Sequence, residues 1–198
     1  MPTRMLLLFA SLLLAGCRPF LELGYSPPAP EYLPGLASRP FNLVVTDLRP
    51  YVTHARKFPF YLGIVRGGYG NPIDVFNKQK RSLAEQMKGD LRQELLSLGM
   101  VEASGAAVPQ LSVRIHDWNF DSAVSSRFWY DVEVSVTTPD GKLLANNRAE
   151  DTKILDNTNV FTGGIPAMQK AMPAFYAELI HKLIRNDPAI LTALQLGR

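Results

Sequence analysis

Cysteine is almost absent from this 198-residue chain, whose one cysteine is Cys17. A domain folded from the remaining residues therefore has no disulfide and depends on its hydrophobic core. An excess of one charge is also absent, because 21 basic side chains face 18 acidic ones and leave a formal net charge of only +3. Without a basic stripe or a long run of like charge, we expect no nucleic-acid partner.

Histidine is also scarce. The three histidines, His54, His116 and His181, lie far apart in the chain, with no further ligand at metal-binding spacing. We therefore expect no metal and no cofactor. No serine lies in the glycine-flanked turn of a nucleophile elbow, so the sequence offers no residue for acyl transfer. These absences predict a protein that is not an enzyme.

The N-terminus has the composition of an export signal. Arg4 precedes an apolar run over 5–14, and Ala15-Gly16 follows directly before Cys17. The run has about ten residues, whereas a membrane span takes about 20. Small residues before a cysteine are what a lipoprotein-processing peptidase requires, so we predict a signal peptide over 1–16 and acyl chains, palmitate among them, on Cys17. The alternative is an ordinary secretory signal with an incidental cysteine.

Lipid on Cys17 would hold the chain on a membrane without crossing it, because two acyl chains already give stable anchoring. No later segment resembles a second apolar span. The cysteine is followed by Arg18 and not by the aspartate that commonly retains lipoproteins at the inner membrane. We therefore expect attachment to the outer membrane, with the domain in the periplasm.

Proline interrupts the stretch from Arg18 to Pro40 six times, which excludes a regular helix or an inner strand. We expect residues 17–40 to act as a tether, which at about 3.1 Å per residue could extend on the order of 70 Å. The alternative is that part of it, Leu21 to Tyr25, packs along the domain as an irregular edge. Residues 41–198 would form a single domain.

Strand patterns recur within the domain. Short β-branched or alternating runs predict strands over 41–48, 110–117, 128–136 and 142–154. A change of phase at Asp117-Trp118 indicates a bulge, and Pro139-Asp140-Gly141 predicts the turn of a hairpin.

Helical patterns separate and follow these strands. Apolar residues at spacings of three and four predict a helix over 78–98 that ends at Gly99. A second stripe from Met168 to Leu183 predicts another helix, with a kink or its main start at Pro173, and Asp187-Pro188 would open a short last one. The expected fold class is α+β, with a mainly antiparallel sheet of about four strands and two amphipathic helices on one face.

Several segments together resemble the YajG family of bacterial lipoproteins. They are Asp47-Leu48-Arg49-Pro50, the run from Tyr61 to Pro72 with its glycines, Leu98-Gly99-Met100, the Pro139-Asp140-Gly141 hairpin, and Asp187-Pro188 followed by Leu191 and Leu194. The resemblance covers most of the chain after Cys17. It implies an envelope lipoprotein of poorly defined molecular role and supplies no catalytic residue that could be transferred.

Two segments could form a binding surface. The loop Arg66-Gly67-Gly68-Tyr69-Gly70-Asn71 could hold an anion or a glycan end with its backbone amides, although a close-packed turn is the simpler interpretation. It lacks the Gly-Lys-Ser/Thr ending of a phosphate-binding loop. Trp129 is out of phase with the core residues of its strand, so its indole should face a partner unless a helix or the tether covers it.

A pair of carboxylates leaves a second function open. Asp117 and Asp121 flank Trp118 and Phe120, and carboxylates beside aromatics are what a glycan hydrolase uses, although aspartates at a strand end also suit turn chemistry. We expect a non-enzymatic scaffold lipoprotein that binds a protein or another envelope component. The alternative is an enzyme or sensor that acts on peptidoglycan or a related glycan through the Asp117/Asp121 region.

Overall fold

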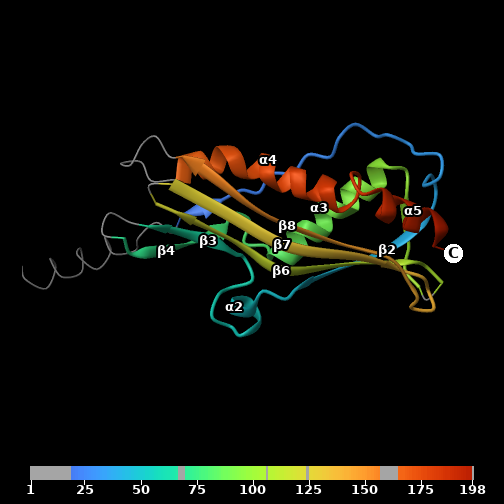
Figure 1. The fold of residues 1–198 in the computed structure, drawn as a ribbon, viewed down its shortest axis with the longest axis horizontal. Helices are drawn as coiled ribbons and strands as arrows, with labels where there is room; N and C mark the ends of the chain where they lie inside the picture. Colours follow the sequence, from blue (N-terminus) through green and yellow to red (C-terminus); the bar gives the residue numbers. More distant parts are fainter. Residues whose placement is uncertain (1–18, 67–69, 106, 124, 157–164, 198) are drawn as a thin grey trace, which may run out of the picture.

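A single mixed β-sheet runs along the molecule, and three helices lie on one of its faces (Figure 1). The computed structural model describes residues 19–66, 70–105, 107–123, 125–156 and 165–197. Three long strands, β6 (Gln110–Ser122), β7 (Ser125–Thr137) and β8 (Leu143–Asp156), pair antiparallel, and β8 lies at the edge. These strands form one half of the sheet.

The other half of the sheet is mostly parallel. Along the second edge of β6, β2 (Pro40–Asp47) pairs with its first half and β3 (Tyr61–Arg66) with its end, both in parallel. β3 continues into antiparallel β4 (Pro72–Asn77), while β1 (Phe20–Leu21) and β5 (Val101–Glu102) add parallel pairs to β4 and β2.

The expected sheet of about four mainly antiparallel strands is therefore wrong, because the sheet is mixed and has eight strands within the described residues. The physical reason is the length of β6, whose 13 residues let two shorter strands share one edge.

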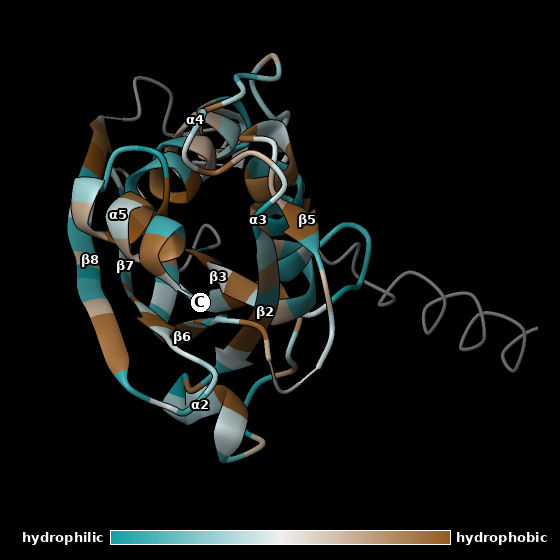
Figure 2. Cartoon of the chain, turned by 90° about the vertical axis from the view of Figure 1, so that its right-hand side faces the viewer, coloured by the Kyte–Doolittle hydropathy of each residue, from teal (hydrophilic) through white to brown (hydrophobic). Residues whose placement is uncertain are grey.

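Four helices are described: the two amphipathic helices and the short last helix that were expected, and one further short helix that was not. α3 (Leu83–Ser97), α4 (Ile165–Leu183) and α5 (Pro188–Leu196) cover one face of the sheet, and the short α2 (Pro50–Thr53) lies on the other side (Figures 1 and 2). α3 starts later than its pattern indicated, because Ser82 and Glu85 form a capping box. None of the helices in the described ranges has the length and apolar composition needed to cross a bilayer.

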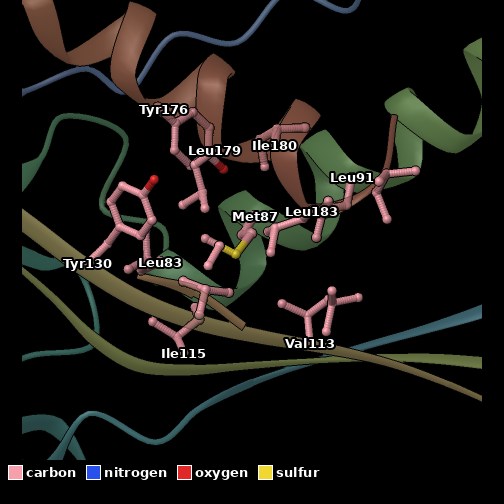
Figure 3. Close-up of a cluster of buried hydrophobic side chains, with 14 of the residues drawn as sticks. Leu83, Met87, Leu91, Val113, Ile115, Tyr130, Tyr176, Leu179, Ile180 and Leu183 are labelled. Atoms are coloured by element: carbon pink, nitrogen blue, oxygen red, sulfur yellow. The ribbon is translucent and has the colours of Figure 1, made fainter. Parts of the chain in front are cut away.

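The core lies between the sheet and the three long helices (Figure 3). The stripe predicted for α3 is confirmed, because its apolar side chains are buried, as is the alternation predicted for β7. A register shift between Ile115 and Asp117 confirms the bulge on β6. The predicted cap of α5 is confirmed as well, since Asp187 accepts hydrogen bonds from Ala189 N and Ile190 N.

The proline-rich stretch before β2 lies against the domain. The carbonyl of Pro19 accepts a hydrogen bond from Phe76 N at 3.2 Å. The stretch also adds leucines to the core, namely Leu21, Leu23 and Leu36. The expectation of a tether over 17–40 is therefore corrected from Pro19 onwards, where burial of these leucines outweighs the freedom of an extended chain. Cys17 lies outside the described residues.

Candidate binding face of the sheet

The face of the sheet opposite α3, α4 and α5, here called the outer face, is polar. On β7 it carries the side chains between the buried ones, Trp129 among them, as the strand phase predicted. On β8, which is mostly hydrophilic (Figure 2), Glu150 and Thr152 lie beside Asp131 and Trp129. Since these strands pair in register, their polar side chains form a continuous surface.

The bulge on β6 sets which residues of that strand reach the outer face. After it, Trp118 enters the core at 0% exposure, while Asp117 remains half-buried. Asn119 and Asp121 follow in the same phase and pair with Trp129 and Arg127 of β7. The one residue inserted at the bulge therefore places the Asp117 and Asp121 side chains on the outer face instead of the core face.

Six side chains form a line across this face, which we call the outer-face strip: Arg66, Asp121, Arg127, Trp129, Asp117 and Tyr51. Arg66 Nε lies 2.9 Å from Asp121 Oδ1, and the Arg127 guanidinium lies 5.7 Å from the centre of the Trp129 ring. Trp129 Nε1 donates to Asp117 Oδ2 at 2.9 Å, and Tyr51 OH donates to Asp117 Oδ1 at 3.1 Å. The strip thus brings together Arg66 and Trp129, both predicted from the sequence.

Trp129 stands at the centre of the strip. Its side chain is half-buried and lines a pocket of about 350 Å³, whose other walls include Arg127 and Glu150. The three long helices lie on the opposite face of the sheet (Figure 1). The hydrogen bond to Asp117 fixes the indole, so an approaching molecule would meet an ordered aromatic surface with a cation and carboxylates beside it.

The predicted glycine-rich loop joins two antiparallel strands. Arg66 ends β3 and pairs with Pro72 of β4, and Gly70 between them has a φ of +78°, which favours glycine. Gly67, Gly68 and Tyr69 lie outside the described residues, and Asn71 is exposed. Anion binding by the loop therefore stays a prediction. The Arg66 side chain is 42% exposed, and hydrogen bonds to Asp121 raise the pKa of its guanidinium.

Asp117 and Asp121 are not arranged as the carboxylate pair of a glycosidase. Asp117 accepts hydrogen bonds from two side chains of the strip and from Trp118 N, and Asp121 is ion-paired with Arg66. They lie four residues apart on β6, a separation of about 13 Å at about 3.3 Å per residue. Glycosidases hold their carboxylates about 5 to 9.5 Å apart. The geometry does not favour the alternative function.

Arg49 supports the segment that carries Tyr51. It is fully buried, forms an ion pair with Asp47 at 2.7 Å, and donates to Tyr61 O at 2.8 Å and to Pro59 O at 3.0 Å. Burial raises the pKa of Tyr51, the Arg49 cation opposes this rise, and the Asp117 carboxylate adds to it. The Tyr51 hydroxyl therefore stays protonated, and its one hydrogen can be donated to Asp117 Oδ1 or to the Trp118 carbonyl oxygen, which lies 2.5 Å away.

Sequence reasoning did not find Arg49, Tyr51 or Arg127. Arg127 had a signal, because it lies two residues before Trp129 and shares its strand phase. Tyr51 had none, since its partner Asp117 lies 66 residues further along the chain.

Two of the three histidines, His116 and His181, lie beside acidic side chains. His116 Nε2 lies 2.9 Å from Glu133 Oε2, a contact that lowers the pKa of the Glu133 carboxyl, and His181 Nε2 lies 4.0 Å from Glu94 Oε2. Within the described ranges, no group of three or more His, Cys, Asp or Glu side chains is placed to hold a metal ion.

The fold and the strip define an α+β protein with a helix-covered face and a polar outer face. No protein-family model matches the sequence, and no curated protein matches it. Among solved structures, protein XCC0632 from Xanthomonas campestris, described under family DUF330, has a TM-score of 0.54 at 10% identity, covering 84% of this chain and 95% of that one. This likeness shows a shared fold.

Two further solved structures are more distant. A minor lipoprotein from Acinetobacter baumannii has a TM-score of 0.40 at 7% identity, covering 76% of this chain and 94% of that one. Lipoprotein GNA1162 from Neisseria meningitidis has a TM-score of 0.30 at 11% identity, covering 71% and 99%. At these scores neither carries an argument about this chain. The resemblance to the YajG family stays a prediction.

Proposed function

We propose that this chain is a bacterial lipoprotein related to the YajG family, attached through lipid on Cys17 to the periplasmic face of the outer membrane. It binds a protein of the cell envelope through the outer-face strip and catalyses no reaction. The export signal and the small residues before Cys17 support the anchor.

The observation that carries the binding role is the position of Trp129 between Arg127 and Asp117 on the face that the long helices leave uncovered. Tryptophan and arginine are enriched among the residues that dominate interface energies. A side chain already fixed by a hydrogen bond loses little conformational entropy on binding, which favours its use as an anchor.

Photo-crosslinking in intact cells tests this role. A photoreactive residue replaces Thr152, which is exposed beside Trp129, or Lys170, which is exposed on α4. We expect a defined protein adduct from position 152 that is absent from position 170. Trp129→Ala and Arg127→Ala should reduce this adduct.

Arg92→Ala is the matched control, because it removes an exposed ion pair with Glu102 on another part of the surface. It should leave the adduct unchanged. Equal adducts from positions 152 and 170, or an adduct insensitive to Trp129→Ala, would contradict the proposed surface. Urea unfolding of each variant checks that the fold is intact.

The anchor has a separate test. Protein extracted from membranes should have the mass of residues 17–198 plus acyl chains, and Cys17→Ser should keep the precursor mass. An unacylated mature protein would remove the membrane attachment from the proposal and leave the binding surface to its own test.

A further inference from the structure

The chain leaves the described part of the molecule at the edge of β4. Phe20 and Leu21 pair in parallel with Phe76 and Asn77, and the carbonyl of Pro19 is held by Phe76 N at 3.2 Å. Cys17 lies only two residues before Pro19. Since a fully extended chain spans at most about 3.6 Å per residue, lipid on Cys17 would enter the bilayer within about 7 Å of this point.

The surface beside this edge is aromatic and apolar. Phe58 and Ile73 are 55% and 43% exposed, and Phe20, which is 38% exposed, belongs to the same edge through its pairing with Phe76. The Phe58 ring stacks on Phe60 with centres 5.1 Å apart and meets the Phe76 ring edge-on at 6.2 Å. Phe58, Ile73 and Phe76 also line a groove of about 490 Å³. Exposed apolar groups gathered in this way mark an interaction site.

The charges around this patch suit a lipid surface. Lys57 is paired with Asp74 at 2.6 Å, and Lys78 with Glu22 at 3.1 Å. Both carboxylates are thus neutralised by lysines, and the lysine ammonium groups can also meet lipid phosphates. The patch can approach anionic headgroups without repulsion from these two acids.

We infer that Phe20, Phe58 and Ile73 lie in the boundary between headgroups and acyl chains of the membrane that holds the Cys17 lipid. This inference rests on the proposed lipid anchor. The domain then lies on the bilayer with the edge of β4 facing it, instead of standing off at the end of a long tether. Phenylalanine and aliphatic side chains on a protein face that lies on a bilayer are buried at this depth, where they leave water.

This orientation also restricts the partner of the outer-face strip. Arg66, at one end of the strip, pairs with Pro72 of β4 and so lies on the hairpin that faces the membrane. A protein that binds the strip must therefore reach close to the bilayer surface.

Single cysteines carrying an environment-sensitive fluorophore test the orientation. Cys17 is the only natural cysteine, and acylation would block its thiol, so Phe58→Cys, Ile73→Cys or Leu143→Cys supplies the one reactive group. The full acylated protein is placed in vesicles of phosphatidylethanolamine and phosphatidylglycerol. Leu143 is the control, being 57% exposed and next to the turn between β7 and β8, at the end of the molecule opposite β4 (Figure 1).

We expect nitroxide lipids labelled near the headgroup to quench the fluorophore several-fold more at positions 58 and 73 than at 143. Phe58→Cys removes the stack on Phe60, so Ile73→Cys provides the reading that does not disturb it. Equal quenching at all positions on an acylated protein overturns the inference alone, and a patch that binds protein instead of lipid gives this result. An unacylated Cys17 in the mass spectrum overturns the anchor and the inference together.

Discussion

Arg49 is a buried cation whose contacts hold together the residues around the outer-face strip. Its side chain is 0% exposed and forms an ion pair with Asp47, whose side chain is 12% exposed. We predict that Arg49→Met destabilises the protein by about 3 to 5 kcal/mol, because the carboxylate of Asp47 and two carbonyls lose their partner. Urea unfolding measures this loss.

Arg148→Met is the control for this prediction. Arg148 is 57% exposed in its ion pair with Asp131, and such a surface pair contributes little to stability because solvent screens it. A similar loss of stability in both variants would show that burial of the Arg49 pair is not decisive.

Asp90 gives a prediction that depends on pH. It is 6% exposed on α3, and its Oδ2 accepts hydrogen bonds from Gln86 at 2.7 Å and from Tyr176 OH at 2.8 Å. Burial raises the pKa of the Asp90 carboxyl above the ordinary 3.8, although both hydrogen bonds oppose the rise. The stabilisation that comes from this raised pKa is therefore fully present below the pKa of Asp90 in the unfolded chain. It is lost as pH rises through the pKa of Asp90 in the folded protein.

Asp90→Asn removes this titration and keeps an oxygen for both donors. The stability of the parent relative to this variant should fall as pH rises from about 4, the unfolded value, towards neutrality. Urea unfolding across that range measures the difference. Asp140→Asn should give the opposite slope, because the Thr138 hydroxyl lowers the pKa of the Asp140 carboxyl. A flat difference for Asp90→Asn would contradict the prediction.

At the scale of elements, Gly63 sets how closely β3 approaches β6. A Cβ at this position would lie 2.5 Å from Phe120 Cδ1 and 2.6 Å from Phe120 O, so Gly63→Ala must push the strands apart. We predict a loss of about 1 to 3 kcal/mol, the usual cost of overpacking. The variant should also weaken the contact between Arg66 and Asp121, because β3 carries Arg66. Unfolding and the crosslinking yield from position 152 report the two effects.

Gly89 is the matched glycine in α3. A Cβ there meets nothing within 4 Å, so Gly89→Ala should stabilise the protein by about 1 kcal/mol through higher helix propensity. Equal effects of the two substitutions would mean that contact with Phe120 does not decide the response at Gly63.

Elements with a strong local period could be predicted from the sequence, and their partners could not. The stripe on α3 and the alternation on β7 depend only on neighbouring residues, so both were found. Asn42 of β2 pairs in parallel with Gln110 of β6, and no local pattern connects two segments so far apart. The short β1 and β5, of two residues each, carry no period that could be read.

At the scale of the whole molecule, the sequence predicted which face of the sheet Trp129 occupies, but it did not predict which other residues join Trp129 in the candidate site. The outward phase of Trp129 and the bulge at Asp117 both follow from strand periodicity. The hydrogen bond between them, and the pairing of Arg66 with Asp121 across 55 residues, arise only when β3, β6 and β7 assemble. The proline content of residues 17–40 indicated an extended tether. The stretch from Pro19 onwards packs on the domain instead, because the leucines between its prolines are buried in the core.

The two tryptophans test whether the helices cover one face only. Trp118 is 0% exposed, with its ring centre 5.7 Å from that of Tyr176 on α4, whereas Trp129 is half-buried on the outer face one pairing position away. We predict that acrylamide quenches the fluorescence of Trp118→Phe, which retains Trp129, several-fold more than that of Trp129→Phe. A neutral quencher avoids attraction by Arg127. Trp129→Phe should become equally quenchable only when urea unfolds it. Equal quenching in the native state would mean that both faces are covered alike, and the outer-face strip would then lose the exposure on which its proposed partner depends.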